Sequence, residues 1–336
     1  KIRALVDAQP RIRLATLPTP LEPLPRLTAA LGGPTLFVKR DDLTGLAFGG
    51  NKARQLEYVF GDVLRQNPDV LVTGANIQSN WSRQAAAAAA RFGIPIILIL
   101  RNTDMQEIQG NVLLDYWLGA DVRFVDEPDT ANIFRYIAAT VAELRAQGKR
   151  AVSLDAWSPA TALGYIDMML ELDEQCEQRE LSPSILWLSA AGSTQAGILL
   201  GARLLSWNLR VVGVAPFTWP DRTIPALVSN IANQAASLLG VKARIETGDV
   251  ENLPSYIGPG YAVPSEDGLR AMRLAARTDA LLLDPVYTAK ALAGLMDQVQ
   301  KGSIDKDESI IFLHTGGLPA LFAYREAVER MSKTTI

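Results

Sequence analysis

The sequence has very few of the residues on which disulfides and metal sites depend. Its 336 residues include one cysteine, Cys176, and one histidine, His314. A lone cysteine cannot form an intramolecular disulfide, so a reducing compartment is permitted. A lone histidine excludes a zinc site made of several histidines, and any Ser-His-Asp hydrolase would depend on His314 alone. Because His314 lies within the run Leu-His-Thr-Gly-Gly, we expect it to have a structural role, and we expect no metal site.

The sequence also lacks a surplus of basic charge and a long apolar run. It has 33 Lys and Arg residues against 36 Asp and Glu residues, a formal net charge of −3. This balance provides no basic surface for nucleic acid and no cationic face for an anionic membrane. The apolar segment 94–100 is far shorter than the roughly 18 residues that span a bilayer, and no signal peptide is recognisable. We therefore expect a cytoplasmic protein without nucleic-acid or membrane partners.

Short apolar segments alternate with amphipathic stretches along nearly the whole chain, which favours βαβ units and parallel sheets. The length allows about two domains, and we expect two α/β lobes with the first inserted after Lys52. The first 35 residues are proline-rich and extended, and residues 216–264 are less regular. Strands are expected at 36–40, 70–73, 94–100, 122–125, 151–154, 185–189, 210–214, 281–283 and 310–313. Helices are expected at 24–31, from 52, and at 81–91, 109–118, 133–147, 162–175, 196–206, 266–278, 288–301 and then to about 331.

A lysine follows two glycines at the start of one of these helices, in the run Phe-Gly-Gly-Asn-Lys-Ala-Arg-Gln over residues 48–55. Asn51 can cap the helix, and the glycines let the backbone pass close to a bound molecule. The positive end of the helix dipole would lower the pKa of Lys52 and make its free amine easier to reach. The alternative is that Lys52 is a solvated lysine in the first turn after a flexible loop.

Four loops follow the expected parallel strands, at the edge where open α/β sheets bind ligands: 74–80, 155–159, 190–197 and 314–317. The third loop reads Ala-Ala-Gly-Ser-Thr-Gln-Ala-Gly, and its small residues and hydroxyls suit a phosphate, although an ordinary capped turn looks the same. Ser79 or Asn80 is either a simple N-cap or part of a carboxylate site. Tyr261 and Tyr287 are either half-buried core residues or part of the same site.

These features together indicate pyridoxal phosphate. That cofactor needs an amine for a covalent bond, a cradle for its phosphate and a partner for its pyridine nitrogen. Lys52, the 190–197 loop and the hydroxyl of Thr315 would supply the three.

The sequence resembles a known family at seven places, which lie in the family's order over nearly the whole chain. The resemblance is to pyridoxal-phosphate enzymes of the tryptophan synthase β type, in the branch of 1-aminocyclopropane-1-carboxylate deaminase, D-cysteine desulfhydrase and L-cysteate sulfo-lyase. It implies a homodimer of two α/β domains with open, twisted, mostly parallel sheets and helices on both faces. Residues 1–52 with 162–336 would form the large cofactor domain, and residues 53–161 a small inserted one. The matching segments are 48–57, 78–80, 110–120, 192–197, 258–264, 284–287 and 314–317.

The resemblance also implies roles for single residues. Lys52 would bond covalently to the cofactor and act as base or acid at the substrate's Cα. Asn80 would contact the cofactor's 3′ oxygen, and Thr315 with Gly316 would face its pyridine ring. The phosphate would be held by Gly192, Ser193, Thr194, Gln195 and Gly197.

On the substrate side, Ser79 and the amides after it would bind the substrate carboxylate, together with Asn80. Tyr287 would be a second acid or base, with Tyr261 close to it. Trp81 and Trp157 would line the substrate pocket. The implied reaction removes the Cα proton, expels a β-substituent and releases a 2-oxo acid and ammonia.

Which reaction the chain catalyses depends on the partner of the pyridine nitrogen. The deaminases of the branch have a glutamate at the position of Thr288, whereas Thr288 and Thr315 here are neutral hydroxyls. A neutral partner makes the ring a weaker electron sink, which suits the loss of a good leaving group better than the opening of a carbon ring. We therefore expect a β-eliminating lyase like D-cysteine desulfhydrase acting on a small amino acid.

Three alternatives stay open. The phosphate loop looks more like that of the deaminases, which favours 1-aminocyclopropane-1-carboxylate deaminase. L-Cysteate sulfo-lyase, or a diverged member with another amino-acid substrate, is the second. The third is a protein that binds its ligand without turnover, because Gln55 replaces a basic residue, Trp81 a His or Gln, and residues 155–157 a Gly-Gly-Ser run.

Overall fold

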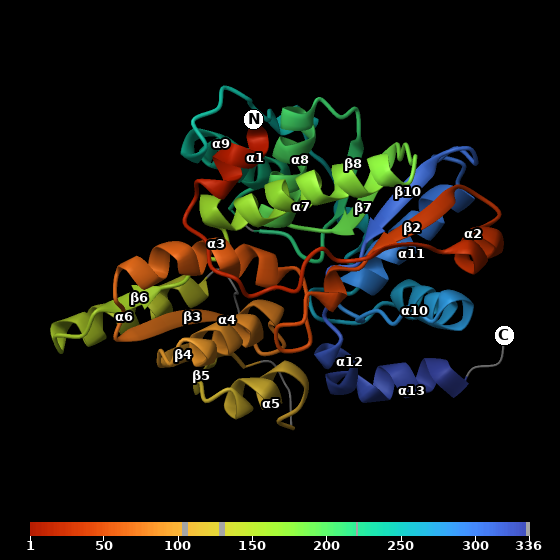
Figure 1. The fold of residues 1–336 in the computed structure, drawn as a ribbon. Coiled ribbons are helices and arrows are strands. Elements are labelled where there is room, and N and C mark those ends of the chain that lie inside the picture. Colours follow the sequence, from red (N-terminus) through yellow and green to blue (C-terminus); the bar gives the residue numbers. More distant parts are fainter. Residues whose placement is uncertain (103–106, 128–131, 220, 334–336) are drawn as a thin grey trace.

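The larger of two sheets joins the beginning and the end of the chain. In the computed structural model, which describes residues 1–102, 107–127, 132–219 and 221–333, β2 and β10 pair in parallel although about 270 residues separate them (Figure 1). All neighbours in this sheet are parallel except β1 and β2. Its order is β1 (Leu21–Pro23), β2 (Thr35–Lys39), β10 (Ser309–Leu313), β7 (Ile185–Ser189), β8 (Arg210–Val214) and β9 (Glu251–Leu253).

The smaller sheet is wholly parallel and comes from the segment between β2 and β7. Its central strands β3 and β4 are buried and apolar along most of their length, as strands covered on both faces are. Its order is β5 (Asp121–Val125), β4 (Ile96–Arg101), β3 (Val70–Asn76) and β6 (Ala151–Ser153).

Helices cover both faces of each sheet. One face of the large sheet packs against α1 (Ile2–Asp7), α7 (Pro159–Gln178), α8 (Ser193–Leu205) and α9 (Ile224–Leu238). Its other face packs against α2 (Pro25–Leu31), α10 (Glu266–Asp279), α11 (Thr288–Gln300) and α13 (Arg325–Lys333). The small sheet packs against α3 (Lys52–Arg65), α4 (Asn80–Arg91) and α5 (Gly110–Trp117) on one side and α6 (Ile133–Ala146) on the other, and α12 (Pro319–Ala323) lies against α5.

The α/β class with parallel sheets is confirmed, and the structure differs from the expected elements in several places. The entry segment, expected to be extended, begins with the short helix α1. The three-residue strands β1 and β9 at the edges of the large sheet were not expected either. The apolar segment 281–283 is not a strand. Leu281 and Leu283 are buried while Leu282 is exposed, and this alternation imitates a strand although the segment joins no sheet. The region expected to be irregular contains the 15-residue helix α9, which Thr223 caps through a bond from the Ala226 N–H. Thr223 followed by a proline in the first turn was the available signal.

Helix α3, which begins at Lys52, packs against α4 on the small sheet and against α7 on the large one. The predicted boundaries at 52/53 and 161/162 stay a prediction. No helix among the described residues is long and apolar enough to cross a bilayer. The expected cytoplasmic location stays a prediction as well.

Gly197 lies on α8 in close contact with α7. A Cβ atom there would lie 2.3 Å from the Ala162 carbonyl oxygen and 2.6 Å from the Cβ of Tyr165. Such distances are far below van der Waals contact, so only glycine allows these two helices to approach this closely. The structure thus gives Gly197 a role in helix packing, whereas the sequence suggested a phosphate contact.

We expect Gly197→Ala to lower the free energy of unfolding by about 1–3 kcal/mol, because α8 must move away from α7. Urea unfolding followed by circular dichroism measures this loss. Gly248→Ala is the control: Gly248 is exposed and a Cβ there would meet nothing within 4 Å, so its effect should stay within about 0.5 kcal/mol. Equal stability of the two variants would contradict the packing role.

Candidate active site

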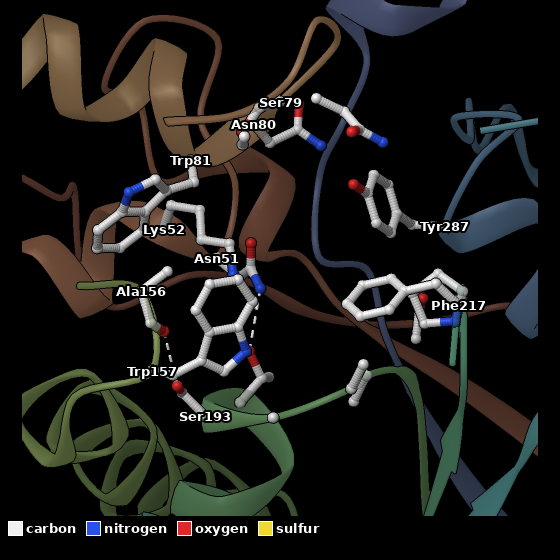
Figure 2. A pocket seen from close by; sticks show the side chains of 18 of the residues that line it. Asn51, Lys52, Ser79, Asn80, Trp81, Ala156, Trp157, Ser193, Phe217 and Tyr287 are labelled. Atoms are coloured by element: carbon white, nitrogen blue, oxygen red, sulfur yellow. Dashed lines mark hydrogen bonds between the residues drawn. The ribbon is translucent and has the colours of Figure 1, made fainter. Parts of the chain in front are cut away.

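One pocket lies where the carboxyl ends of strands from both sheets face each other (Figure 2). Its wall includes residues after β3, β6, β7, β8 and β10, together with the first turns of α3, α4 and α8. The structure therefore brings together most of the residues singled out from the sequence. Those that line the pocket are Lys52, Ser79, Asn80, Trp81, Trp157, Gly192, Ser193, Thr194, Tyr261, Tyr287 and Thr315, whereas Gln195, Gly197 and Gly316 lie outside its wall.

Lys52 extends into this pocket from the first turn of α3. Among the described residues, its amine has no hydrogen-bond or ion-pair partner, and burial lowers its pKa from the ordinary 10.5 to about 8. The lowered pKa agrees with the direction expected from the sequence, and burial is a cause that the sequence did not reveal. Asn51 stands at the N-cap position, but its side chain does not cap the helix. Its Nδ2 instead donates to Thr194 Oγ1 at 3.1 Å.

A buried ion-pair network fixes the start of α3. Arg54 donates to both carboxylate oxygens of Asp41 at 3.0 Å and to both of Glu171, on α7, at 2.9 and 3.0 Å. Lys39 pairs with the same Glu171, and the Tyr165 hydroxyl donates to Asp41 at 2.7 Å. Since Arg54 is only two residues beyond Lys52, this network holds the Lys52 backbone in place.

The loop before Lys52 is bonded to the end of β10. The Asn51 N–H donates to the Thr315 carbonyl at 2.9 Å, and the Gly50 N–H donates to the Asp41 carbonyl at 3.0 Å. Gly316 has a φ of +92°, and a Cβ on it would lie 2.6 Å from the Cα of Gly50. These contacts explain how Thr315 reaches the pocket next to Lys52. Gly316 allows its backbone to lie against that of Gly50, where a side chain would not fit.

His314 is fully buried beside this loop. The Gly316 N–H donates to its Nδ1 at 3.2 Å, so Nδ1 is unprotonated and Nε2 carries the proton that is donated to the Leu282 carbonyl at 2.8 Å. Both ring nitrogens are therefore used by backbone groups, in line with the structural role expected for it.

The N-terminus of α8 forms a cradle for an anion. Backbone N–H groups of the first turn open toward the pocket at residues 192–194. Thr194 Oγ1 accepts one hydrogen bond from Asn51 Nδ2 and one from Gln55 Nε2, both at 3.1 Å. Because both lone pairs of the oxygen are occupied, its proton remains free to be donated to an anion. Ser193 Oγ donates to the Ala156 carbonyl at 2.8 Å and thereby holds the loop against residues 156–157 (Figure 2).

Gln195 points away from this cradle. Its amide donates to the Glu251 carbonyl at 2.7 Å, and its oxygen accepts from Asn252 Nδ2 at 2.9 Å. It therefore joins α8 to β9. The resemblance assigned it to the phosphate together with its neighbours Ser193 and Thr194, which do line the pocket.

The N-terminus of α4 lies across the pocket from α8. Ser79 is the N-cap, and its oxygen accepts from the Ser82 N–H at 3.1 Å. Asn80 accepts from Asn111 Nδ2 at 3.0 Å, and Trp81 Nε1 donates to Thr73 Oγ1 at 2.9 Å. The cap and the carboxylate site considered from the sequence are compatible, since the first-turn N–H groups still face a ligand.

Two tyrosines complete the pocket beside Thr315. The hydroxyls of Tyr261 and Tyr287 lie 2.6 Å apart, and burial raises the pKa of both, so that both are protonated at neutral pH. Asp284 fixes the backbone of Tyr287 through bonds from the N–H groups of residues 286–288. Thr288 also donates its hydroxyl to Asp284, at 2.7 Å, and does not line the pocket. The electronic argument from the sequence therefore rests on Thr315 alone.

Sequence reasoning missed three aromatic residues of the wall, Phe134, Phe217 and Trp219. Phe217 and Trp219 follow β8, where the strand-end rule would have found them had the region after 216 not looked irregular. Phe134 lies on α6, outside the four strand-end loops, and nothing in the local sequence indicates that it reaches the pocket.

The residues present fit pyridoxal phosphate. The pocket contains an unpaired amine on Lys52, a cradle of N–H groups with one free hydroxyl proton at Thr194, and a hydroxyl at Thr315 for the pyridine nitrogen. The cation that the resemblance led us to expect is absent at Gln55, whose amide orients Thr194 instead.

Comparison with known proteins gives the same result. The model of the family described as "Pyridoxal-phosphate dependent enzyme" matches residues 12–316. D-cysteine desulfhydrase of Salmonella newport (strain SL254) is 36% identical over 329 residues, which cover 95% of this chain and 97% of that protein, and that of Salmonella typhi has the same values.

Solved structures agree. The crystal structure of an ACC deaminase homologue superposes with a TM-score of 0.89 at 33% identity and covers 98% of this chain and 99% of its own. The processed form of threonine deaminase isoform 2 from Solanum lycopersicum, at 15% identity and a TM-score of 0.68, covers 99% of this chain and 92% of its own and shares the fold. The match over most of the chain shows that this protein belongs to the family of pyridoxal-phosphate dependent enzymes.

Proposed function

We propose that this protein is a lyase that removes the β-substituent of a small amino acid, with D-cysteine as the model substrate and pyruvate, sulfide and ammonia as products. The observation that carries the proposal is the unpaired amine of Lys52, with its pKa near 8, in the same pocket as the anion cradle of α8. The similarity to D-cysteine desulfhydrases over 95% of the chain supports the reaction type.

The side chains divide the work of such a reaction. Pyridoxal phosphate, when bound, withdraws electrons from the substrate's Cα and so makes its proton acidic. Lys52 would hold the cofactor covalently and then receive that proton, since its low pKa leaves a neutral amine available. Ser79 and the first-turn N–H groups of α4 would bind the substrate carboxylate. Tyr287, protonated and bonded to Tyr261, would donate a proton to the leaving sulfur.

The charge of the pocket favours this reaction over the two related ones. Among the described residues, no carboxylate lines the pocket, so the pyridine nitrogen would face the neutral Thr315. That arrangement weakens the electron sink, which disfavours the opening of a cyclopropane ring. Lys52 is also the only cation of the described wall, and a sulfonate such as that of cysteate would lack a partner.

We also propose that the protein is a homodimer. Apolar side chains are exposed on α5 and α12, which lie against each other: Trp117 is 83% exposed, Phe322 69% and Leu113 42%. Exposed apolar side chains on two neighbouring helices are typical of a protein interface, and a second copy of this chain would cover them.

Addition of pyridoxal phosphate to the cofactor-free protein should produce a near-visible absorbance band. The rate at which the band appears should rise with pH and level off above about 8, because burial lowers the pKa of Lys52 to that value. With an ordinary lysine, the rate would continue to rise up to about pH 10.5. Lys52→Ala should give no such band. Lys290→Met is the control and should keep the band, since the Lys290 amine donates hydrogen bonds to two carbonyls outside the pocket. A wild-type protein without the band at any pH would contradict the proposal.

The reaction itself is measured as 2-oxo-acid release. D-Cysteine, or a β-substituted relative such as β-chloroalanine, should yield pyruvate, and Lys52→Ala should abolish it. Release of 2-oxobutanoate from 1-aminocyclopropane-1-carboxylate, without pyruvate from the other substrates, would indicate the deaminase instead. A protein that keeps the absorbance band but exchanges no Cα hydrogen of any amino acid would be a ligand-binding protein without turnover.

Disruption of the apolar surface should dissociate the dimer. Trp117→Lys places a charge at the last residue of α5, where the helix dipole tolerates it. It should halve the mass measured by light scattering at micromolar concentration. Leu238→Lys is the matched control, since Leu238 is the last residue of α9 and is 43% exposed. Figure 1 shows that α9 lies far from α5. Wild-type protein that is monomeric at all concentrations would refute the dimer.

A further inference from the structure

A continuous series of aromatic rings leads away from the tyrosine pair. Tyr287 contacts Tyr261 with ring centres 6.2 Å apart, and Tyr261 contacts Phe217 at 5.0 Å. Phe217 contacts Trp219 at 5.3 Å, Trp219 contacts Trp157 at 5.4 Å, and Trp157 contacts Phe134 at 5.6 Å. We call Phe217, Trp219, Trp157 and Phe134 the aromatic wall. All four line the pocket that contains Lys52, and Figure 2 shows Trp157 and Phe217 among the side chains of its wall.

The aromatic wall is suited to an uncharged group. Lys52 is the only charged residue in the described part of the pocket wall, and in the holoenzyme it would be bonded to the cofactor. Neither an anionic nor a cationic side chain of a substrate would then find an opposite charge on this wall. Aromatic faces and edges instead stabilise apolar and aromatic groups, which they contact edge to face as they contact one another. The substituent of a substrate held at the tyrosine pair would therefore extend along these rings.

The far end of the wall leads to more space. A second cavity of about 470 Å³ lies beneath α6 and shares Trp81, Phe134 and Trp157 with the pocket. Its remaining wall includes the apolar side chains Ile137 and Val141. It also includes Arg145 and Asp155, whose side chains are already hydrogen-bonded to the Ala151 carbonyl and the Trp157 N–H. The single sulfur of cysteine would leave most of this space empty, whereas a ring on that sulfur would extend along the aromatic wall toward the second cavity.

We propose that the substrates are cysteine thioethers with a bulky, uncharged apolar or aromatic group on sulfur. This inference rests on the β-elimination of the proposed function. The Cα proton is removed and the Cβ–S bond breaks with its electron pair on sulfur, which takes up a proton and leaves as a thiol. The remaining aminoacrylate is hydrolysed, so that RS–CH₂–CH(NH₃⁺)–COO⁻ and water give RSH, pyruvate and NH₄⁺.

The test compares thioethers of different size on the holoenzyme. Pyruvate release is measured with S-benzylcysteine, S-methylcysteine and cysteine, each as both enantiomers. For the active enantiomer, kcat/KM should be at least about 100-fold higher with S-benzylcysteine than with S-methylcysteine, since a single methylene in an apolar pocket already contributes tenfold or more. Equal or faster turnover of S-methylcysteine or cysteine would overturn the inference and leave the proposed function intact.

Two matched variants locate the effect. Phe134→Ala should lower the preference for S-benzyl over S-methyl about tenfold. Phe124→Ala is the control: Phe124 is 43% exposed against 42% for Phe134, but it lies on β5 outside both cavities, so it should change neither substrate. A Phe134→Ala variant that slows both substrates equally would show that the wall does not select the substituent.

Binding without reaction separates the two proposals. 3-(Benzylthio)propanoate and 3-(methylthio)propanoate have no amino group and cannot react with the cofactor. Quenching of tryptophan fluorescence in the holoenzyme measures their binding, and the benzyl compound should bind at least tenfold more tightly. If it does so while neither cysteine nor any thioether is turned over, the β-lyase fails and the apolar preference stands. Equal binding of the two acids contradicts the inference whatever the turnover.

Discussion

The buried ion network around Arg54 is the interaction on which the arrangement of the site depends. Burial alone would raise the pKa of Glu171, but hydrogen bonds and charge from Arg54 and Lys39 lower it to about 2, so the carboxylate stays ionised. Burial opposes the charge of Arg54 as well, yet Asp41 and Glu171 raise its pKa above the ordinary value. Loss of one partner from such a network costs about 3–5 kcal/mol. The network thus fixes α3 against α7, and with it the position of Lys52.

Lys52 differs from Lys39 and Lys290 in the hydrogen-bond partners of its amine more clearly than in its pKa. Burial lowers the pKa of Lys290 to about 8, the same value as for Lys52. Lys290, however, donates to the carbonyls of Ile257 and Gly260 and thereby holds the loop that carries Tyr261. Lys39 is paired with Glu171. Lys52 alone among the three lacks a partner in the described structure, and an amine that must react with a carbonyl has to be free.

The pocket is built largely from neutral groups around that amine. Gln55 stands where the resemblance led us to expect a cation, and it acts through Thr194, whose hydroxyl proton it leaves free for an anion. The helix N-terminus of α8 and this oriented hydroxyl would then stabilise a phosphate without a full positive charge. The same neutrality extends to the aromatic wall, where it restricts which substituents the pocket accepts.

The sequence by itself determined the α/β class, the order of most elements and the cofactor. Local rules suffice for these: glycines before Lys52, small residues at the start of α8 and a capping Ser79 each leave a signal over a few residues. Tertiary structure alone decided which loop residues face the pocket. Gln195 and Gly197 lie in the same short stretch as Thr194, but one turns to β9 and the other packs against α7, because a helix turns each successive side chain by about 100°. It also decided that Phe134 meets Trp157 and Trp219, since their contact joins elements far apart in the chain.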